Sequence, residues 1–299
     1  MADVVTVAIP VRDGGPLLDE VLAAACAQEV DAPVELLVCD SGSRDDSVAT
    51  ARRHGAEIIE IAPASFSHGG TRNDLMCRAA GSHVAFLTQD ATPADEHWLA
   101  GLLDGFKRAD DVALTFGPYR PRPDAPAPVR RELAEWFAGM ALNGGPATVR
   151  LENAERPVAR SLIPQARLFF SDANGCIARA AWEEVPFRDV PYAEDRLLAA
   201  ELLAAGYAKV FVPDAAVLHS HRYPPIKHLR RCFDEWRALN EISGYVEPVS
   251  LMALVDAVRE DGLQSLPHHA TRAIGAALGS RAKRLPPGVR RRISLEGRA

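Results

Sequence analysis

The sequence is poor in cysteine and has no cysteine spacing typical of a redox pair or a zinc site. Its 5 cysteines are an odd number, lie far apart and form no C-x-x-C pair. A disulfide framework is therefore excluded, and a reducing cytoplasm is the expected compartment. No stretch reaches the roughly 18 apolar residues of a membrane-spanning helix. The first residues also lack the basic and apolar regions of a signal peptide, so we expect no secretion.

The chain has no excess of positive charge. Its formal net charge of −6 gives no electrostatic reason to expect a nucleic-acid partner. The C-terminal tail differs, because its basic residues face only Glu296. We interpret the tail as a solvated, frayed end; the alternative is peripheral contact with anionic lipids on the inner face of the membrane. The basic residues are Arg281, Lys283, Arg284, Arg290, Arg291, Arg292 and Arg298.

A dinucleotide fingerprint is also absent. After a predicted strand at 4–9 the chain reads Pro10-Val11-Arg12-Asp13-Gly14-Gly15, which is not G-x-G-x-x-G. This counts against a nicotinamide-dependent oxidoreductase. A glycine-containing turn still lets the backbone approach a ligand, so Pro10, Val11 and Arg12 are candidate ligand contacts.

Short apolar runs alternate with helical patterns in the first half of the chain. This alternation predicts an α/β fold with a mostly parallel sheet, right-handed crossovers and flanking helices. The predicted strands are 4–9, 34–39, 56–61, 83–87 and 112–116, and the predicted helices are 16–30, 45–54, 71–80 and 95–108.

The second half is less regular. Five prolines in 117–128 predict an extended surface passage, and 146–167 has no period, which predicts a mobile loop that closes over a ligand. We expect two halves of one domain, 1–118 and 119–245, and a helical C-terminal extension with the basic tail, 246–299. Predicted strands are 167–170, 175–178, 209–212 and 215–218, and predicted helices are 129–142, 193–206, 225–242 and 249–280.

Acids and imidazoles occur where predicted strands end or helices begin. Asp40 and Asp90 each follow a strand, Glu194-Asp195 begins a helix, and His219-Ser220-His221 follows the last short strand. Ligands of an open α/β sheet bind outside the carboxyl ends of its strands. This placement predicts one site for a charged, metal-bound ligand.

Two other segments offer ligand contacts. In Asp40-Ser41-Gly42-Ser43 the acid can accept a hydrogen bond from a base or ribose, because Asp45 is closer to the next helix and is the better candidate for its cap. In 66–73 two glycines open a helix whose positive end, with Arg72, can hold phosphate or ribose. The alternative for Arg72 is an exposed arginine beside a tight turn.

As a set, these motifs resemble the inverting glycosyltransferases of family 2, which have the GT-A fold. The segment 38–43 is similar to that family's VDDGS motif, 66–73 to HGxTRN, Thr88-Gln89-Asp90 to DXD, and Glu194-Asp195 to the ED motif. The resemblance covers roughly residues 4–240 and is greatest to bacterial rhamnosyltransferases of polysaccharide assembly. It implies a dTDP- or UDP-sugar donor and a hydroxyl acceptor such as a lipid-linked glycan. Its donor-contact positions correspond to Pro10, Val11, Arg12, Asp40, Ser41, Arg72, Gln89 and Asp90.

The chain departs from the family pattern at two acids. Thr88 replaces the first acid of DXD, and Ser41 replaces the second acid of the VDDGS pair. The resemblance therefore leaves Asp90 as the main carboxylate ligand for Mn²⁺ or Mg²⁺. His219 or His221 is the candidate second ligand, since residues at i and i+2 share one face of an extended strand. Imidazole suits Mn²⁺ better than Mg²⁺, and a simple hydrogen-bonding role remains the alternative for each histidine.

The same resemblance assigns catalysis to the ED pair. Asp195 would be the general base that deprotonates the acceptor, with Glu194 beside it. The alternative is that both acids only stabilise the positive end of a helix. Asp172 and Asn174 are candidate acceptor contacts because their segment precedes the ED helix.

Other functions stay open at this point. Asp90, His219 and His221 also fit a metal oxygenase, although such sites usually lie in all-β barrels and the α/β alternation argues against one. The altered DXD motif leaves a catalytically silent sugar-nucleotide-binding or scaffold protein as the main alternative. The C-terminal helices leave a homodimer open.

Overall fold

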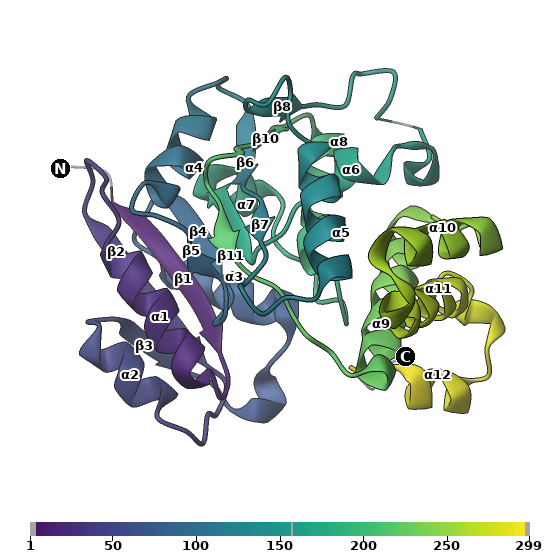
Figure 1. Cartoon of the computed structure of the whole chain (residues 1–299). Coiled ribbons are helices and arrows are strands. Elements are labelled where there is room, and N and C mark those ends of the chain that lie inside the picture. Colours follow the sequence, from purple (N-terminus) through teal and green to yellow (C-terminus); the bar gives the residue numbers. More distant parts are fainter. Residues whose placement is uncertain (1–3, 157, 297–299) are drawn as a thin grey trace.

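The first half of the chain forms the predicted alternation of strands and helices. The computed structural model describes residues 4–156 and 158–296, and Figure 1 shows a large sheet between helices. All nine elements predicted for this half are present, with ends shifted by a few residues. They are β1 (Val5–Val11), α1 (Gly15–Cys26), β2 (Val34–Asp40), α2 (Ser47–Arg53), β3 (Glu57–Glu60), α3 (His68–Arg78), β4 (His83–Leu87), α4 (Trp98–Phe106) and β6 (Val112–Phe116).

The large sheet has eight strands in the order β3-β2-β1-β4-β9-β6-β10-β8. Strands β3, β2, β1 and β4 pair in parallel, as do β6 and β10. The α/β fold with a mostly parallel sheet is confirmed. Its remaining strands are β8 (Ala147–Val149), β9 (Asn174–Ala178) and β10 (Ala208–Phe211).

Two predictions for the second half are wrong. The segment 146–167, predicted to be a mobile loop, contains β8, which pairs antiparallel with β10 and forms one edge of the sheet. The predicted strand 167–170 is instead the end of a short helix, α6 (Gln165–Leu168), and the turn after it. The other helices of this half are α5 (Ala127–Ala138), α7 (Arg179–Glu184) and α8 (Glu194–Ala205).

Strand β9 runs antiparallel to both of its neighbours, β4 and β6. Its first residue, Asn174, therefore lies opposite Leu87, the last residue of β4. The chain entering β9 thus lies at the edge where the parallel strands end. This brings residues 171–173 beside the segment that follows β4.

A second, three-stranded sheet has the order β5-β11-β7. Strand β11 pairs antiparallel with β5, with Leu218 opposite Thr92. Each strand of this sheet has only two residues. The small sheet joins three loops that are far apart in the sequence. The strands are β5 (Thr92–Pro93), β7 (Tyr119–Arg120) and β11 (Val217–Leu218).

Apolar residues of the large sheet pack on both of its faces. In β1, Val7 and Ile9 face α1 and α4, whereas Ala8 faces α3, as the period of two in a strand requires. Trp98 is completely buried in the first of these layers. Burial on both faces explains why the strands read as continuous apolar runs.

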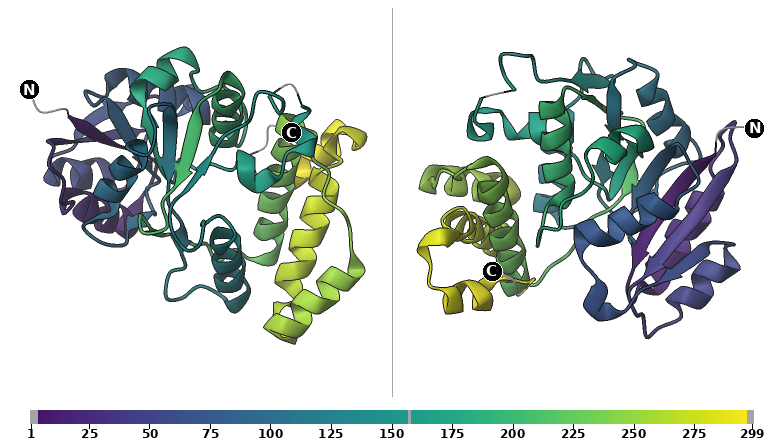
Figure 2. Two further views of the ribbon diagram at one scale, coloured as in Figure 1. Left: turned by 90° about the horizontal axis from the view of Figure 1, so that it is seen from above. Right: turned by 180° about the vertical axis from the view of Figure 1, so that it is seen from behind.

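Four helices form a separate layer beside the sheet, as the views in Figures 1 and 2 agree. Helix α9 crosses α11 closely, since a Cβ atom at Gly279 would lie 2.4 Å from the carbonyl oxygen of Phe233. This packing places α9 with the C-terminal helices, whereas the predicted boundary at 246 follows α9 in the chain. The helices are α9 (Pro225–Ser243), α10 (Leu251–Asp261), α11 (Leu266–Gly279) and α12 (Pro287–Ile293).

The basic tail is folded rather than frayed up to residue 296. The buried carboxylate of Asp234 accepts hydrogen bonds from the Ser294 hydroxyl (2.7 Å) and from the backbone N–H groups of Leu295 (2.6 Å) and Glu296 (3.2 Å). The prediction of a frayed end is therefore wrong for this part of the tail, and Arg298 lies outside the described residues. Within 4–156 and 158–296, no helix has the length and apolar character needed to cross a membrane.

Candidate active site

One aspartate and two histidines meet at the carboxyl edge of the sheet. Asp90 Oδ1 lies 3.5 Å from His219 Nδ1, and Asp90 Oδ2 lies 3.7 Å from His221 Nδ1. The antiparallel pairing of β5 with β11 causes this meeting, because Asp90 precedes β5 and the histidines follow β11. Both histidines, rather than one of them, face Asp90.

This trio has the donor set of a divalent-cation site. One ligand atom from each residue lies within 4.8 Å of the other two. Among the described residues, His219 Nδ1 and Thr88 Oγ1 are buried without a hydrogen-bond partner. Burial and, second, the neighbouring His219 lower the pKa of the His221 imidazole to about 4, which favours the neutral, metal-binding form. Two imidazoles and a carboxylate fit Mn²⁺ better than Mg²⁺.

Hydrogen bonds from Arg122 connect the segments that carry this trio. Its guanidinium donates to the carbonyl of Asp90 (3.0 Å) and to the hydroxyl of Thr92 (2.7 Å). Its backbone N–H donates to the hydroxyl of Ser220, between the two histidines (3.0 Å). Arg122 lies in the proline-rich passage, for which the sequence predicts only an extended surface path.

A buried cluster of charges lies at the start of α8. The guanidinium of Arg72 forms an ion pair with Asp172 and another with Glu194, 3.0 Å from Glu194 Oε1. All three residues are buried, with exposed fractions of 4% to 5%. Burial raises the pKa values of the Asp172 and Glu194 carboxyl groups, and the charge of Arg72 opposes the rise.

The alternative of an exposed Arg72 is wrong, because two carboxylates far along the chain pair with its guanidinium. Its predicted contact with phosphate or ribose stays a prediction. Asn174 does not face an acceptor, since it is completely buried and its amide joins Trp98, Pro118 and Ala215 by hydrogen bonds.

Both acids of the ED pair line the open cavity, and Asp195 is the less buried of the two. Its Oδ1 accepts a hydrogen bond from the backbone N–H of Arg196 (2.7 Å), and its Oδ2 accepts one from the backbone N–H of Asp172 (3.4 Å). Ala193, which comes directly before the ED pair, has a left-handed backbone with φ of 61°. Such a conformation costs a non-glycine residue roughly 1–2 kcal/mol, and here it turns the chain sharply into α8.

A single cavity of about 390 Å³ joins the trio to the ED pair. It opens between the loop after β4, the entry to β9, the start of α8 and the segment after β11. Asp195 and Asp90 both line it, as the sequence predicts. Asp40 does not line it.

The predicted nucleotide contacts lie along the same carboxyl edge of the sheet, where β1, β2 and β4 end. Gln89 and Arg12 form a reciprocal pair, in which the Arg12 N–H donates to the Gln89 side chain (2.7 Å) and the Gln89 amide donates back to the Arg12 carbonyl (3.1 Å). Ser41 donates its N–H to the carbonyl of Val11 (2.9 Å), and Pro10 lies opposite Cys39 in the paired strands. These hydrogen bonds join the loops after β1, β2 and β4.

Asp40 is not free for a ligand in the way its position predicts. Its carboxylate accepts hydrogen bonds from the backbone N–H groups of Gly42 (2.9 Å) and Ser43 (3.0 Å). Gly42 has a φ of 88°, so the chain turns back over the carboxylate that precedes it. Asp45 does bond to the start of α2, where its Oδ1 accepts from the N–H of Ser47 (3.0 Å).

Sequence reasoning missed Arg231 of α9, which also lines the cavity. Its guanidinium carbon lies 4.6 Å from the centre of the Tyr192 ring. Within the described part of the chain it has no carboxylate in ion-pair distance, in contrast to Arg72. No local motif marks it, because the sequence predicts only a helix at 225–242 and no functional motif within it.

A second cavity of about 670 Å³ adjoins the first between α5 and α9. Tyr119, Phe169 and Arg196 line both cavities. The rings of Trp136 and Trp236 also line the second cavity, and Trp236 Nε1 is a buried donor with no partner among the described residues. Aromatic faces with unpaired polar groups suit an amphipathic ligand.

Comparison with known sequences agrees with this geometry. The family described as Glycosyl transferase family 2 matches residues 6–177. The O-antigen chain rhamnosyltransferase WbaN of Salmonella anatum is 30% identical over 233 residues, which is 77% of this chain and 70% of that protein. The O-antigen chain rhamnosyltransferase RfbN of Salmonella typhimurium is 31% identical over 235 residues, with the same coverage of 77% and 70%.

Solved structures share the fold at low sequence identity. The mannosyltransferase PcManGT from Pyrobaculum calidifontis, in complex with GDP-Man and Mn²⁺, has a TM-score of 0.57 at 17% identity, covering 93% of this chain and 74% of that one. S. aureus TarS 1–349, in complex with UDP-GlcNAc, has a TM-score of 0.55 at 15% identity, covering 94% and 91%. These similarities show that this chain has the same α/β fold as the two transferases.

Proposed function

This chain belongs to glycosyl transferase family 2, and we propose that it transfers L-rhamnose from dTDP-L-rhamnose to a hydroxyl group of a growing, lipid-linked polysaccharide. Sugar transfer from a nucleotide sugar follows from membership of the family. The choice of rhamnose is supported by the two similar rhamnosyltransferases.

The shared cavity is the observation that carries the proposal. It places Asp195 and the Asp90–His219–His221 trio on the walls of one space of about 390 Å³. A donor whose diphosphate lies at the trio would present its sugar toward Asp195. The adjoining second cavity gives the acceptor a route to the same carboxylate.

In the proposed reaction Asp195 acts as the general base. Its carboxylate takes the proton from the acceptor hydroxyl while that oxygen forms a bond to the anomeric carbon. The bond between the anomeric carbon and the diphosphate oxygen breaks on the opposite face, so one displacement inverts the anomeric centre. Two backbone N–H groups hold the orientation of the carboxylate. Glu194 pairs with Arg72 and fixes the start of the helix that carries the base.

Asp90, His219 and His221 would hold the divalent cation, for which Mn²⁺ fits the ligands best. When bound there, the cation stabilises the negative charge that builds on the leaving diphosphate. The replacement of an acid by Thr88 is then compensated by imidazole nitrogens that the second sheet brings to Asp90.

The donor and the cation site can be tested together by thermal shift. Saturating dTDP with Mn²⁺ should raise the melting temperature of the wild type more than dTDP alone; a ligand at about 100 times its Kd stabilises by about 2.7 kcal/mol. Asp90→Ala should lose the Mn²⁺-dependent part of the shift, because the trio loses its only carboxylate. An Mn²⁺ titration that is unchanged in this variant would remove Asp90 from the site.

Asp110→Ala is the matched control, because Asp110 is exposed and does not line the cavity. A donor-hydrolysis screen across dTDP- and UDP-sugars then identifies the sugar. If neither dTDP nor UDP raises the melting temperature of the wild type, the proposal of a nucleotide-sugar donor is contradicted. Stabilisation without turnover of any donor and acceptor would favour the catalytically silent alternative.

Arg231 is proposed to contact the donor diphosphate. It is a cation on the cavity wall that forms no ion pair within the described residues, since Glu235 of the same helix pairs with Arg196 instead. Arg231→Ala should raise the KM for the nucleotide sugar roughly tenfold or more, since a hydrogen bond to a charged group contributes about 1.5–3 kcal/mol. Steady-state kinetics with varied donor measures this.

Arg230→Ala is the control, since the neighbouring Arg230 is exposed and outside the cavity. Arg231→Lys should recover part of the donor affinity, because it restores the positive charge without the planar fork. If Arg231→Ala and Arg230→Ala have equal donor KM values, Arg231 does not contact the donor.

A further inference from the structure

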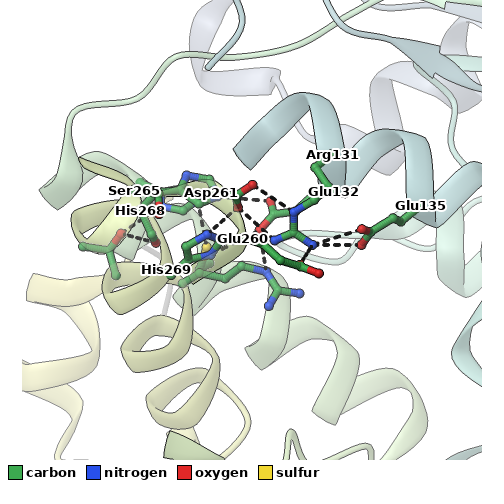
Figure 3. Close-up of polar contacts among 12 residues, drawn as sticks. Arg131, Glu132, Glu135, Glu260, Asp261, Ser265, His268 and His269 are labelled. Atoms are coloured by element: carbon green, nitrogen blue, oxygen red, sulfur yellow. Dashed lines mark hydrogen bonds and ion pairs between the residues drawn. The ribbon is translucent and has the colours of Figure 1, made fainter. Parts of the chain in front are cut away.

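A second group of metal-ligand side chains lies outside the catalytic cavity. Figure 3 shows Glu132 of α5 facing His268 and His269, which belong to the first turn of α11. One ligand atom from each of the three lies within 4.8 Å of the other two. The group joins the α/β part of the molecule to the C-terminal helices, which are far apart in sequence.

The separations of the ligand atoms suit a small cation. Glu132 Oε2 lies 3.1 Å from His268 Nε2, and Glu132 Oε1 lies 3.9 Å from His269 Nδ1. Bonds of about 2.0–2.2 Å to Zn²⁺ in a tetrahedron place the ligand atoms roughly 3.4 Å apart. Small side-chain rotations are therefore enough to bring all three atoms to one ion.

The second ring nitrogen of His269, Nε2, is held by a hydrogen bond with a carboxylate. His269 Nε2 lies 2.7 Å from Asp261 Oδ2, and the guanidinium of Arg131 binds both oxygens of Asp261, at 2.9 Å and 2.8 Å. In metal sites the ligating histidine almost always donates its second N–H to a carboxylate or carbonyl in this way. This bond presents His269 Nδ1 toward Glu132 as a lone-pair donor.

Burial and neighbouring charges are compatible with ion entry. The side chain of His269 is 5% exposed, whereas those of His268 and Glu132 are 18% and 32% exposed. The site is therefore supported from inside and open on one side. Arg272 lies 3.7 Å from Glu132 Oε1 and 5.1 Å from the centre of the Trp236 ring, and its side chain is 43% exposed. His228 stacks on the ring of His268 at 4.3 Å.

We propose that Glu132, His268 and His269 form a zinc site that ties α5 to α11. Two imidazoles and one carboxylate are a common protein ligand set for Zn²⁺, with water in the fourth position. Mg²⁺ and Ca²⁺ prefer oxygen ligands, so the two imidazoles select against them.

The position of the site gives the ion a structural consequence. Val129 and Leu133 of the same α5 line the catalytic cavity, and Glu132 itself lines the second cavity. An ion that fixes α5 against α11 therefore fixes one wall of both cavities. The site does not depend on which sugar or nucleotide the catalytic cavity binds.

The test is a Zn²⁺ titration of the full chain after dialysis against a chelator. A background variant with His219→Ala and His221→Ala removes the two imidazoles of the catalytic trio. It should still bind one equivalent of Zn²⁺ by isothermal titration calorimetry, and Co²⁺ in its place should give the visible absorption of a tetrahedral site. Adding Glu132→Gln and His268→Ala should abolish both signals. Equal binding with and without these two substitutions would overturn the proposal, as would a background variant that binds no Zn²⁺.

Two further variants separate ligation from folding. Asp261→Asn on the same background should weaken Zn²⁺ binding about 10–100-fold without abolishing it, as loss of a carboxylate behind a ligating histidine does elsewhere. His97→Ala removes a histidine whose side chain is 68% exposed and should change nothing. If the Glu132 and His268 double substitution unfolds, as circular dichroism would show, the single Glu132→Gln variant replaces it. That variant should bind Zn²⁺ at least tenfold more weakly, and unchanged affinity would reject the site.

Discussion

Asp195→Asn is expected to abolish most sugar transfer while leaving donor binding intact. The substitution keeps the size of the side chain but replaces the basic carboxylate with a neutral amide, which does not take up the proton of the acceptor hydroxyl. A general base contributes roughly 10²–10⁴-fold to the rate, so kcat should fall by about that factor. The dTDP-dependent thermal shift should stay at the wild-type value, because the donor diphosphate is proposed to lie at Asp90 and Arg231.

The control for this variant is Asp189→Asn, the same acid-to-amide change at an exposed position outside the cavity. It should retain wild-type kcat and melting temperature. A kcat for Asp195→Asn within about threefold of the wild type would be far below the effect of a general base, and Asp195 would then only position α8. Loss of donor binding in parallel with kcat would also argue against a base.

Arg72→Met is expected to destabilise the fold more than any substitution on the protein surface. Arg72 is 4% exposed and forms ion pairs with both Asp172 and Glu194, whereas the nearby His68 lies farther away, with its Nδ1 3.9 Å from Glu194 Oε1. Removing one partner of a buried ion pair typically costs about 3–5 kcal/mol, a large part of the roughly 5–15 kcal/mol that stabilises a protein. Urea unfolding, with midpoints compared at equal slope, measures the loss.

The pH dependence of that loss identifies its cause. Burial already raises the pKa values of Asp172 and Glu194, and removal of Arg72 should raise them further. Carboxyl groups with raised pKa values in the folded state bind protons there that the unfolded chain releases. Their protonation therefore supports the fold at low pH, and this support is lost as pH rises through the folded pKa values. Arg72→Met should be less destabilised at pH 5 than at pH 8.

A double variant separates charge from packing. Adding Glu194→Gln to Arg72→Met removes one of the carboxylates that the first substitution leaves unpaired. The double variant should therefore be more stable than the sum of the two single effects predicts. If the effects add, or if the loss in Arg72→Met is the same at both pH values, the cost arises from lost packing and not from unpaired charge.

The sequence by itself determined the α/β class and the edge of the sheet that carries the site. Apolar runs of strand length followed by helical periods predict parallel strands, and parallel strands end at one edge. Asp90 follows β4 and Asp195 begins α8, so both were expected at that edge, and both line one cavity there. These inferences need only local patterns and the direction of each strand.

The tertiary structure alone decided which side chains face one another. The pairing of β5 with β11 brings both histidines to Asp90, and the antiparallel entry to β9 brings Asp172 to Arg72. The same long-range packing buries Arg72, for which the sequence left an exposed position open as the alternative, and leaves Arg231 on the cavity wall. A charge is buried or free according to partners dozens of residues away, and no local pattern encodes those partners.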